Sequence, residues 1–190
     1  MFRKFSAIGS ALGVAIALTA GAANAATSDS TVRKDFQLFK DVAKSVDRYT
    51  QFTIFDDISA NVKDGVVTLT GKVTMPYKKD DIEKRVAKVD GVRSVNDQIA
   101  VLPVSQFDEQ LRYRIARSIY GNSNFWNYAI MPNPPIHIIV ERGRVTLTGV
   151  VQSDVDRMLA RTLASQSSAF SVTNALKTDA EMRDLNEQSK

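Results

Sequence analysis

The sequence predicts an α+β protein of two tandem αββαβ units, each a small three-stranded mixed sheet covered on one face by two helices. The first observation is a repeat: GVVTLTGKV at residues 65–73 returns as GRVTLTGVV at residues 143–151, with seven of nine positions identical. The second is an alternating apolar row before each copy, and the third is a helical stretch followed by a short apolar strand after it. A repeat of this kind indicates two copies of one structural unit.

The first 25 residues have the pattern of a cleavable secretion signal. Arg3 and Lys4 precede an apolar stretch of small residues at 7–22, and Ala23-Asn24-Ala25 places small residues at the cleavage site. A membrane anchor is the alternative, but the stretch is short and weakly hydrophobic for a spanning helix. We therefore expect cleavage after Ala25 and a periplasmic protein. The chain has no Cys, which excludes a lipid-modified N-terminal Cys, disulfides and thiol catalysis.

The charge of the chain is small. Its formal net charge is +4, and without Arg3 and Lys4 there are 23 basic residues against 21 acidic ones, or +2. Nucleic-acid-binding proteins usually carry a dense basic face. We therefore expect no nucleic-acid partner.

The first unit is predicted over residues 32–102. Apolar residues at helical spacing predict a helix over 32–48, and an alternating strand then ends at Val62. Asp64-Gly65 predicts a hairpin turn, because this pair tolerates positive φ at low cost. A second strand to Val73, a helix over 77–89 that Pro76 introduces, and a third strand over 95–101 complete the unit.

The second unit is predicted over residues 107–178 in the same order. The predicted elements are a helix over 106–120 striped by Phe107, Leu111, Ile115 and Ile119, strands over 136–141 and 145–151, a helix capped by Ser153, and a strand over 170–177. Ser105 and Asp108 form a partial capping pair. The linker 102–105 is too short to let the two units move freely relative to each other, so we expect them to touch. The polar tail 179–190 is expected to fray.

These residues resemble the BON domain family (bacterial OsmY and nodulation). The similarity rests on the αββαβ order, the G-x-VTLTG-x-V string behind an alternating strand, and the closing strands VNDQI (95–99) and VTNAL (172–176). It covers residues 32–102 and 107–178. The resemblance implies a bacterial envelope protein associated with osmotic or envelope stress and with phospholipid surfaces, and it brings no catalytic residues.

No constellation in the sequence indicates an enzyme, a metal site or a cofactor. His137 is the only His and has no Cys or second His to share a metal, so we interpret it as an ordinary strand residue. Asp56-Asp57 lies in an extended segment, where neighbouring side chains point to opposite faces. Asp80-Asp81 lies at a helix start, where acidic groups favour the dipole. Both pairs are interpreted as structural.

Six repeated residues are assigned structural roles. Gly65 and Gly143 are expected at the hairpin turns, and Gly71 and Gly149 on the apolar row, where a side chain would collide with a packed helix. Asp97 and Asn174 are matched polar residues on apolar rows. We expect each to make a side-chain to backbone bond that pins a loop, since an unpaired buried polar group costs about 1–3 kcal/mol.

The second unit is longer than the first by an insertion of about seven residues, within the stretch NSNFWNYAIMPNPP over residues 122–135. Aromatic residues beside basic ones suit a lipid headgroup interface, because rings enter the boundary and cations meet phosphate. The candidate lipid-binding residues are Trp126, Phe125, Tyr128, Arg112, Arg114 and Arg117. The alternative is packing: Phe52 and Phe55 of the first unit align with Phe125 and Tyr128, so some of these rings would form a core plug.

Two function classes follow. The first is a non-enzymatic periplasmic protein that supports envelope integrity or osmotic and envelope stress tolerance through weak binding to anionic phospholipid, a partner that the family resemblance supplies. The second is a protein-binding module or periplasmic chaperone that acts on envelope proteins without lipid contact. It requires an exposed apolar patch or sheet edge rather than a basic rim.

Overall fold

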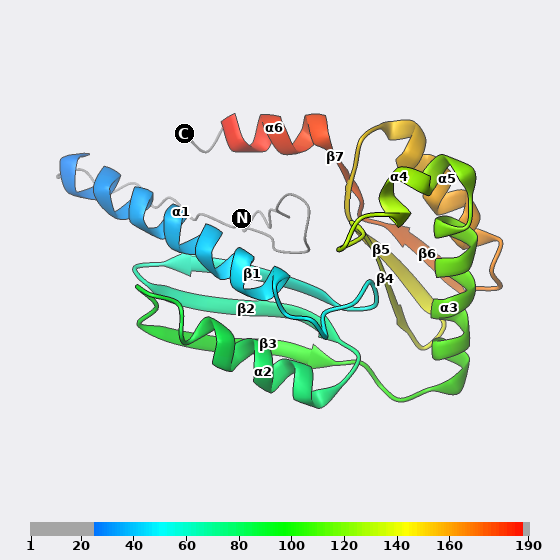
Figure 1. The fold of residues 1–190 in the computed structure, drawn as a ribbon, viewed down its shortest axis with the longest axis horizontal. Coiled ribbons are helices and arrows are strands. Elements are labelled where there is room, and N and C mark those ends of the chain that lie inside the picture. The colour runs from blue at the N-terminus through cyan, green and yellow to red at the C-terminus, as the bar shows by residue number, and fades with distance from the viewer. Residues whose placement is uncertain (1–24, 188–190) are drawn as a thin grey trace.

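The computed structural model describes residues 25–187, and the side chains of residues 34–184, as two units that share an αββαβ core (Figure 1). The first unit consists of α1 (Ala25–Asp47), β1 (Asp57–Lys63), β2 (Val66–Val73), α2 (Pro76–Val86) and β3 (Ser94–Val101). The second consists of α3 (Gln106–Tyr120), η1 (Ser123–Phe125), α4 (Trp126–Ala129), β4 (Ile136–Glu141), β5 (Arg144–Val151), α5 (Asp154–Ser165), β6 (Ser171–Asn174), β7 (Lys177–Thr178) and α6 (Asp179–Glu187).

The predicted α+β class and its tandem arrangement are confirmed. Residues 1–24 of the predicted signal peptide lie outside the described residues, and α1 begins at Ala25, before the start predicted at residue 32. Within residues 25–187, no helix combines the length and the apolar character that crossing a membrane requires.

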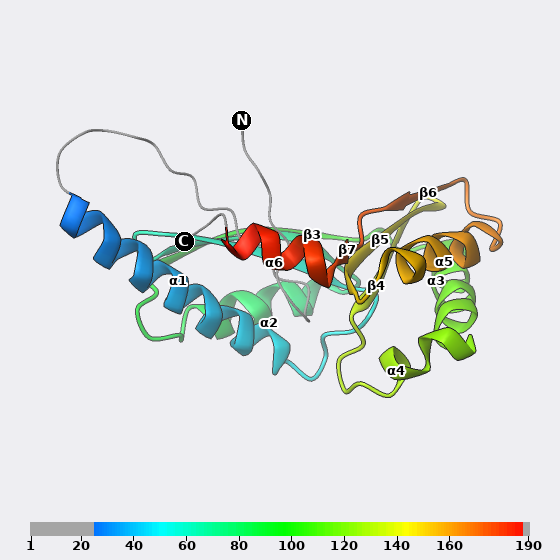
Figure 2. The same ribbon diagram turned by 90° about the horizontal axis from the view of Figure 1, so that it is seen from above.

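Both sheets have the same mixed topology. In the first, β2 pairs antiparallel with β1 and parallel with β3; in the second, β5 pairs antiparallel with β4 and parallel with β6 and β7. Seen from above, α1 and α2 lie on one side of the first sheet, and α3 and α5 lie on one side of the second (Figure 2). Each sheet therefore buries one apolar row against two helices.

The first helix of each unit supplies an equivalent buried stripe, at a sequence offset of 73. These residues are Leu38, Val42 and Val46 in α1, and Leu111, Ile115 and Ile119 in α3. Phe107, which the helical spacing also placed on this stripe, is 46% exposed. The stripe therefore begins one turn later than predicted.

A carboxylate on the first helix holds the hairpin turn in each unit. Asp35 accepts hydrogen bonds from the backbone N–H of Asp64 and Gly65 at 2.7 and 3.1 Å. Asp108 accepts from Arg142 N and Gly143 N at 2.8 and 2.7 Å. Ser105 caps α3 as predicted, accepting from Asp108 N, while the Asp108 side chain serves the turn.

The four repeated glycines lie at two kinds of site. Gly65 and Gly143 have φ of +77° and +73° in two-residue turns, in line with their predicted place. At Gly71 and Gly149 the obstacle is a neighbouring backbone rather than the predicted helix. A Cβ there would lie 2.0 Å from Asp57 O and 1.8 Å from Pro135 O, respectively.

Asp97 and Asn174 both accept a hydrogen bond from the backbone N–H two residues later in the chain. Asp97 Oδ1 accepts from Ile99 N at 2.8 Å, and Asn174 Oδ1 accepts from Leu176 N at 3.3 Å. In the first unit Lys79 Nζ also donates to Ile99 O at 2.9 Å. Because β3 is an edge strand, these side chains cover backbone groups that another chain could otherwise pair with.

The C-terminal segment differs from its prediction in two ways. The strand predicted over 170–177 is split into β6 and β7, and the tail expected to fray contains α6. A capping box explains α6: Thr178 Oγ1 accepts from Glu181 N at 3.2 Å, and Glu181 Oε2 accepts from Thr178 N at 2.9 Å. The T-x-x-E spacing of residues 178–181 was a readable signal for this start.

Replacing Asp108 by Ala should lower the free energy of unfolding by about 3 kcal/mol, because two turn amides lose charged acceptors. Glu109→Ala, on the same helix but exposed, is the matched control and should change stability by less than about 0.5 kcal/mol. Urea unfolding followed by circular dichroism measures both. Equal midpoints for the two variants would contradict this role of Asp108.

Candidate functional site

The insertion of the second unit folds into two short helical turns that divide their side chains between core and solvent. Phe125 is fully buried and Tyr128 is 3% exposed, and their rings lie 5.7 Å apart. Trp126 is 66% exposed and Ile130 is 63% exposed. The spacing of three residues between the buried pair and four between the exposed pair is that of a helix with two different faces.

Tyr128 anchors these turns to α5. Its hydroxyl donates to Asp156 Oδ2 at 2.8 Å and accepts from Gln152 N at 2.8 Å. Burial raises the pKa of Tyr128 to about 12, and the bond to Asp156 adds to that rise. The Tyr128 hydroxyl therefore stays protonated over the physiological pH range and keeps both hydrogen bonds.

The three candidate arginines of α3 also differ in their exposure to solvent. Arg112 is 8% exposed, and its Nη2 donates to Val140 O at 2.8 Å, while burial lowers its pKa. Arg114 and Arg117 are exposed. They line a shallow depression of about 540 Å³ together with Gln110, Tyr113 and Ser118.

The predicted lipid-binding set is thus divided by burial. Phe125, Tyr128 and Arg112 are packing residues that cannot reach a lipid surface, so the corrected candidate set is smaller. Trp126, Arg114 and Arg117 remain accessible, and Ile130 joins them. The insertion thus has a packed face and an exposed face on the same short helical segment.

Sequence reasoning missed an exposed aromatic pair at the other end of α3. Phe170 is 77% exposed and stacks on Phe107 with ring centroids 5.9 Å apart. A comparison of the two repeats could have identified this pair, because the first unit has Lys34 and Arg93 at the positions equivalent to Phe107 and Phe170.

The segment before β1 forms the contact between the two units. Ile138 N, on the outer edge of β4, donates to Ile54 O at 2.7 Å. The Phe55 ring meets Tyr113 edge-on at 5.2 Å, and Lys72 Nζ bonds Glu141 Oε2 at 2.5 Å. The units touch, as the short linker predicted.

His137 lies inside this contact. It is 4% exposed, its Nδ1 lies 2.6 Å from Asp56 O, and burial lowers its pKa. The interpretation as an ordinary strand residue missed this burial, because the first unit covers the outer face of β4. In residues 25–187, no group of three or more His, Cys, Asp and Glu is arranged to hold a metal ion.

Two neighbouring carboxyl groups at the contact have different surroundings. Asp56 is fully buried and accepts hydrogen bonds from Lys78 Nζ at 2.6 Å and from the backbone and hydroxyl of Thr53 and Thr74. Burial raises the pKa of Asp57 to about 6, and contact with the Thr148 hydroxyl across the unit boundary offsets this only in part.

Replacing Asp57 by Asn should stabilise the protein at pH 7.5, because the ionised carboxyl is penalised by burial. The group titrates near 3.8 when unfolded and near 6 when folded, so the penalty is complete above pH 6 and disappears as the pH falls toward 4. The advantage of the variant should be about 1–3 kcal/mol at pH 7.5.

Chemical denaturation of wild type and Asp57→Asn across pH 4–8 measures that difference. Comparing the two proteins cancels the titration of His137, whose lowered pKa acts in the opposite direction as the pH falls. A difference that does not vary with pH would refute the buried-carboxyl explanation.

The comparisons with known proteins agree with this architecture. The family profile of the BON domain matches residues 35–103 and 108–180. The chain is 28% identical over 106 residues to the potassium binding protein Kbp of Escherichia coli O6:H1, and the aligned stretch covers 50% of this chain and 71% of that protein.

Two solved structures of CdsD, a structural protein of the type III secretion system of Chlamydia trachomatis, also match. One has 14% identity and a TM-score of 0.28 over 79% of this chain and 97% of that one; the other, its C-terminal domain, has 14% identity and a TM-score of 0.25 over 72% and 96%. These scores are too low to support an argument. The two profile matches fall on the two structural units and together span most of the chain, and the chain therefore belongs to the BON domain family, with two BON domains in tandem.

Proposed function

We propose that this chain is a non-enzymatic periplasmic protein that supports the bacterial envelope under osmotic or other envelope stress, through weak contact of its second BON domain with anionic phospholipid. The observation that carries the lipid contact is the exposure of Trp126, at 66%. A large aromatic side chain is costly to leave in water, and Trp favours the boundary between lipid headgroups and acyl chains.

The structure around Trp126 suits such a contact. Phe125 and Tyr128 fix η1 and α4 to the core, so Trp126 projects from a rigid support rather than from a free loop. Ile130 follows four residues later and is also exposed. These two side chains supply an apolar point that can enter a membrane boundary without unfolding the domain.

Basic residues on the preceding helix complete the proposed contact. Arg114 and Arg117 are exposed on α3, which leads into the insertion, and their depression can receive a phosphate group. Each basic group near an anionic membrane contributes about 1 kcal/mol at low salt. With few such groups and a small net charge, binding should be weak and salt-sensitive.

Replacing Trp126 by Ala should leave folding nearly intact and lower the fraction of protein that floats with anionic vesicles several-fold. Met158→Ala is the matched control, because Met158 is 68% exposed on α5. This variant shows whether the loss of any exposed apolar side chain lowers flotation. Flotation with phosphatidylglycerol-containing vesicles at low and high salt measures the effect.

The fluorescence of Trp126, the only Trp, reports on the same contact. Its emission should be red in the free protein and shift to the blue when anionic vesicles are added. Absence of both flotation and a blue shift at low salt would remove the lipid proposal. Suppression of client aggregation in that case would select the protein-binding or chaperone class instead.

A further inference from the structure

The stacked rings of Phe107 and Phe170 lie on the β4–β5 turn of the second domain. Gly143 lies directly beneath them: a Cβ on Gly143 would be 2.6 Å from Phe170 Cδ2 and 3.2 Å from Phe107 Cε1. The two rings are nearly parallel, with an interplanar angle of 23°. The absence of a side chain at Gly143 is what lets both rings rest on the turn.

Two hydrogen bonds hold the backbone beneath this pair. Phe170 N donates to Gly143 O at 2.8 Å, and Gly143 N donates to Asp108 Oδ1 at 2.7 Å. Phe107 precedes Asp108 in the first turn of α3. The pair is therefore preorganised, which reduces the entropy lost when a partner binds it.

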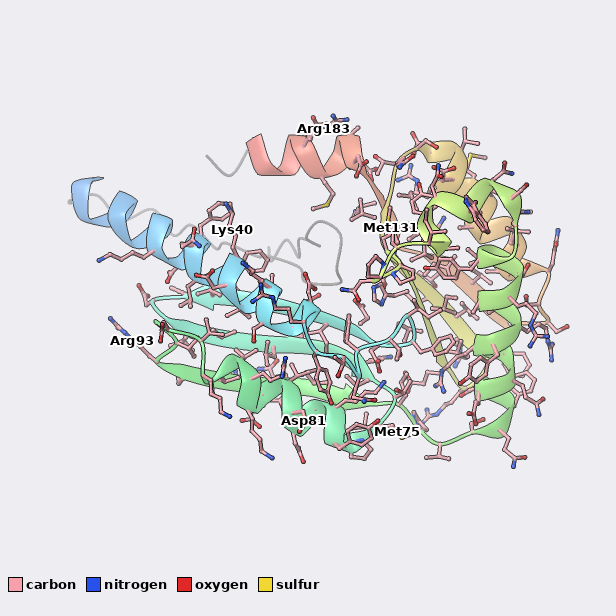
Figure 3. All side chains as sticks on the ribbon, viewed as in Figure 1. Lys40, Met75, Asp81, Arg93, Met131 and Arg183 are labelled. Carbon is pink, nitrogen blue, oxygen red and sulfur yellow. The ribbon has the colours of Figure 1, made fainter. Side chains whose placement is uncertain are left out.

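The first domain shows that the fold does not need these aromatic rings. Arg93 N donates to Gly65 O at 2.8 Å, and a Cβ on Gly65 would be 3.0 Å from Arg93 Cγ, so Arg93 occupies the place of Phe170. Lys34 precedes Asp35 as Phe107 precedes Asp108. Figure 3 shows Arg93 at the far end of the first domain from the second.

The same backbone arrangement thus carries two basic residues in one domain and two exposed aromatic residues in the other. Packing does not explain the difference, because Phe170 leaves most of its surface in water. Exposed aromatic groups of this kind are typical of binding surfaces.

The charges around the pair are mainly positive. Arg142 and Arg144 flank Gly143 and are exposed. The acids nearest to the turn are already engaged, Asp108 by the turn amides and Glu141 by Lys72. Glu109 is exposed on the first turns of α3. The two arginines outnumber it.

The Phe107–Phe170 pair and Trp126 lie near different ends of α3. Phe107 is in the first turn of α3, and Trp126 follows the last turn. The 15 residues of α3 span roughly 20 Å, at 1.5 Å per residue. The two apolar points therefore lie near opposite ends of α3 and are separate surface features.

We propose that the Phe107–Phe170 surface, made of these two residues with Arg142 and Arg144, docks an acidic protein segment that carries an apolar or aromatic side chain among carboxylates. The rings supply the apolar contact, and the arginines supply bidentate bonds to carboxylate and disfavour basic segments. A second copy of the same surface is a poor partner, because the arginines would face one another.

The test uses the whole protein and a display library of random 12-residue peptides. Enriched peptides are synthesised with fluorescein and titrated by fluorescence anisotropy. We expect them to combine Asp or Glu with Phe, Trp or Leu, and to bind more weakly as salt is raised. Failure to enrich such peptides, or enrichment of basic ones, would overturn the proposal.

The decisive variant is Phe107→Lys/Phe170→Arg, which copies the first domain onto the second. It adds positive charge, so a loss of acidic-peptide binding has to come from the missing rings. We expect affinity to fall at least tenfold, and Trp126→Ala to change it less than twofold. Phe107→Gln/Phe170→Gln, which keeps the charge, provides a second test if the first variant melts early.

Vesicle flotation of the same variants separates this surface from the lipid contact. We expect both Phe variants to float with anionic vesicles at least as well as wild type, and Trp126→Ala to float less. If the Phe variants lose flotation while Trp126→Ala keeps it, the pair is a lipid contact and the peptide proposal is wrong. If peptides bind wild type and both Phe variants equally, the pair is not the docking surface.

Discussion

The carboxylate that bridges the first helix to the hairpin turn is the constraint on which each domain depends. Asp35 and Asp108 each accept two backbone amides of a turn whose central residues have positive φ. This contact sets the helix across the end of the hairpin, so that its apolar stripe meets the apolar row of the sheet. In the second domain it also fixes Gly143, on which Phe107 and Phe170 rest. The exposed rings of Phe107 and Phe170 therefore depend on the buried side chain of Asp108, which holds the turn beneath them.

The second constraint is that backbone groups on the outer strand edges need hydrogen-bond partners. The two domains satisfy these groups in different ways. The outer edge of β4 is covered by the segment before β1, whose Ile54 and Phe55 pack into the core of the second domain. That cover buries His137 and desolvates Asp57. On the edge strand β3, the side chains of Asp97 and Lys79 bond the backbone of Ile99 instead. Both devices keep backbone donors and acceptors satisfied.

The second domain departs from the repeat at both ends of α3, and these departures concentrate its exposed aromatic groups. At one end the insertion presents Trp126 on a helical turn that Phe125 and Tyr128 fix to the core. At the other end Phe107 and Phe170 replace basic residues of the first domain. The first domain has the shorter αββαβ form of the fold, and its segment before β1 covers the outer edge of β4. Such a division suits a protein whose two domains share an architecture but differ in what they contact.

The sequence by itself determined the repeat, the αββαβ order of each unit, the two hairpin turns and the caps at Ser105 and Ser153, because each depends on spacing and turn chemistry within a few residues. Tertiary structure decided which faces became accessible. Phe125 and Trp126 are neighbours with the same chemical character, and the packing of η1 and α4 against α3, with the bond from Tyr128 to Asp156 of α5, places one in the core and the other on the surface. His137 follows the strand pattern of an exposed residue, but the first domain covers it. Burial depends on contacts between distant segments, which local periodicity does not encode.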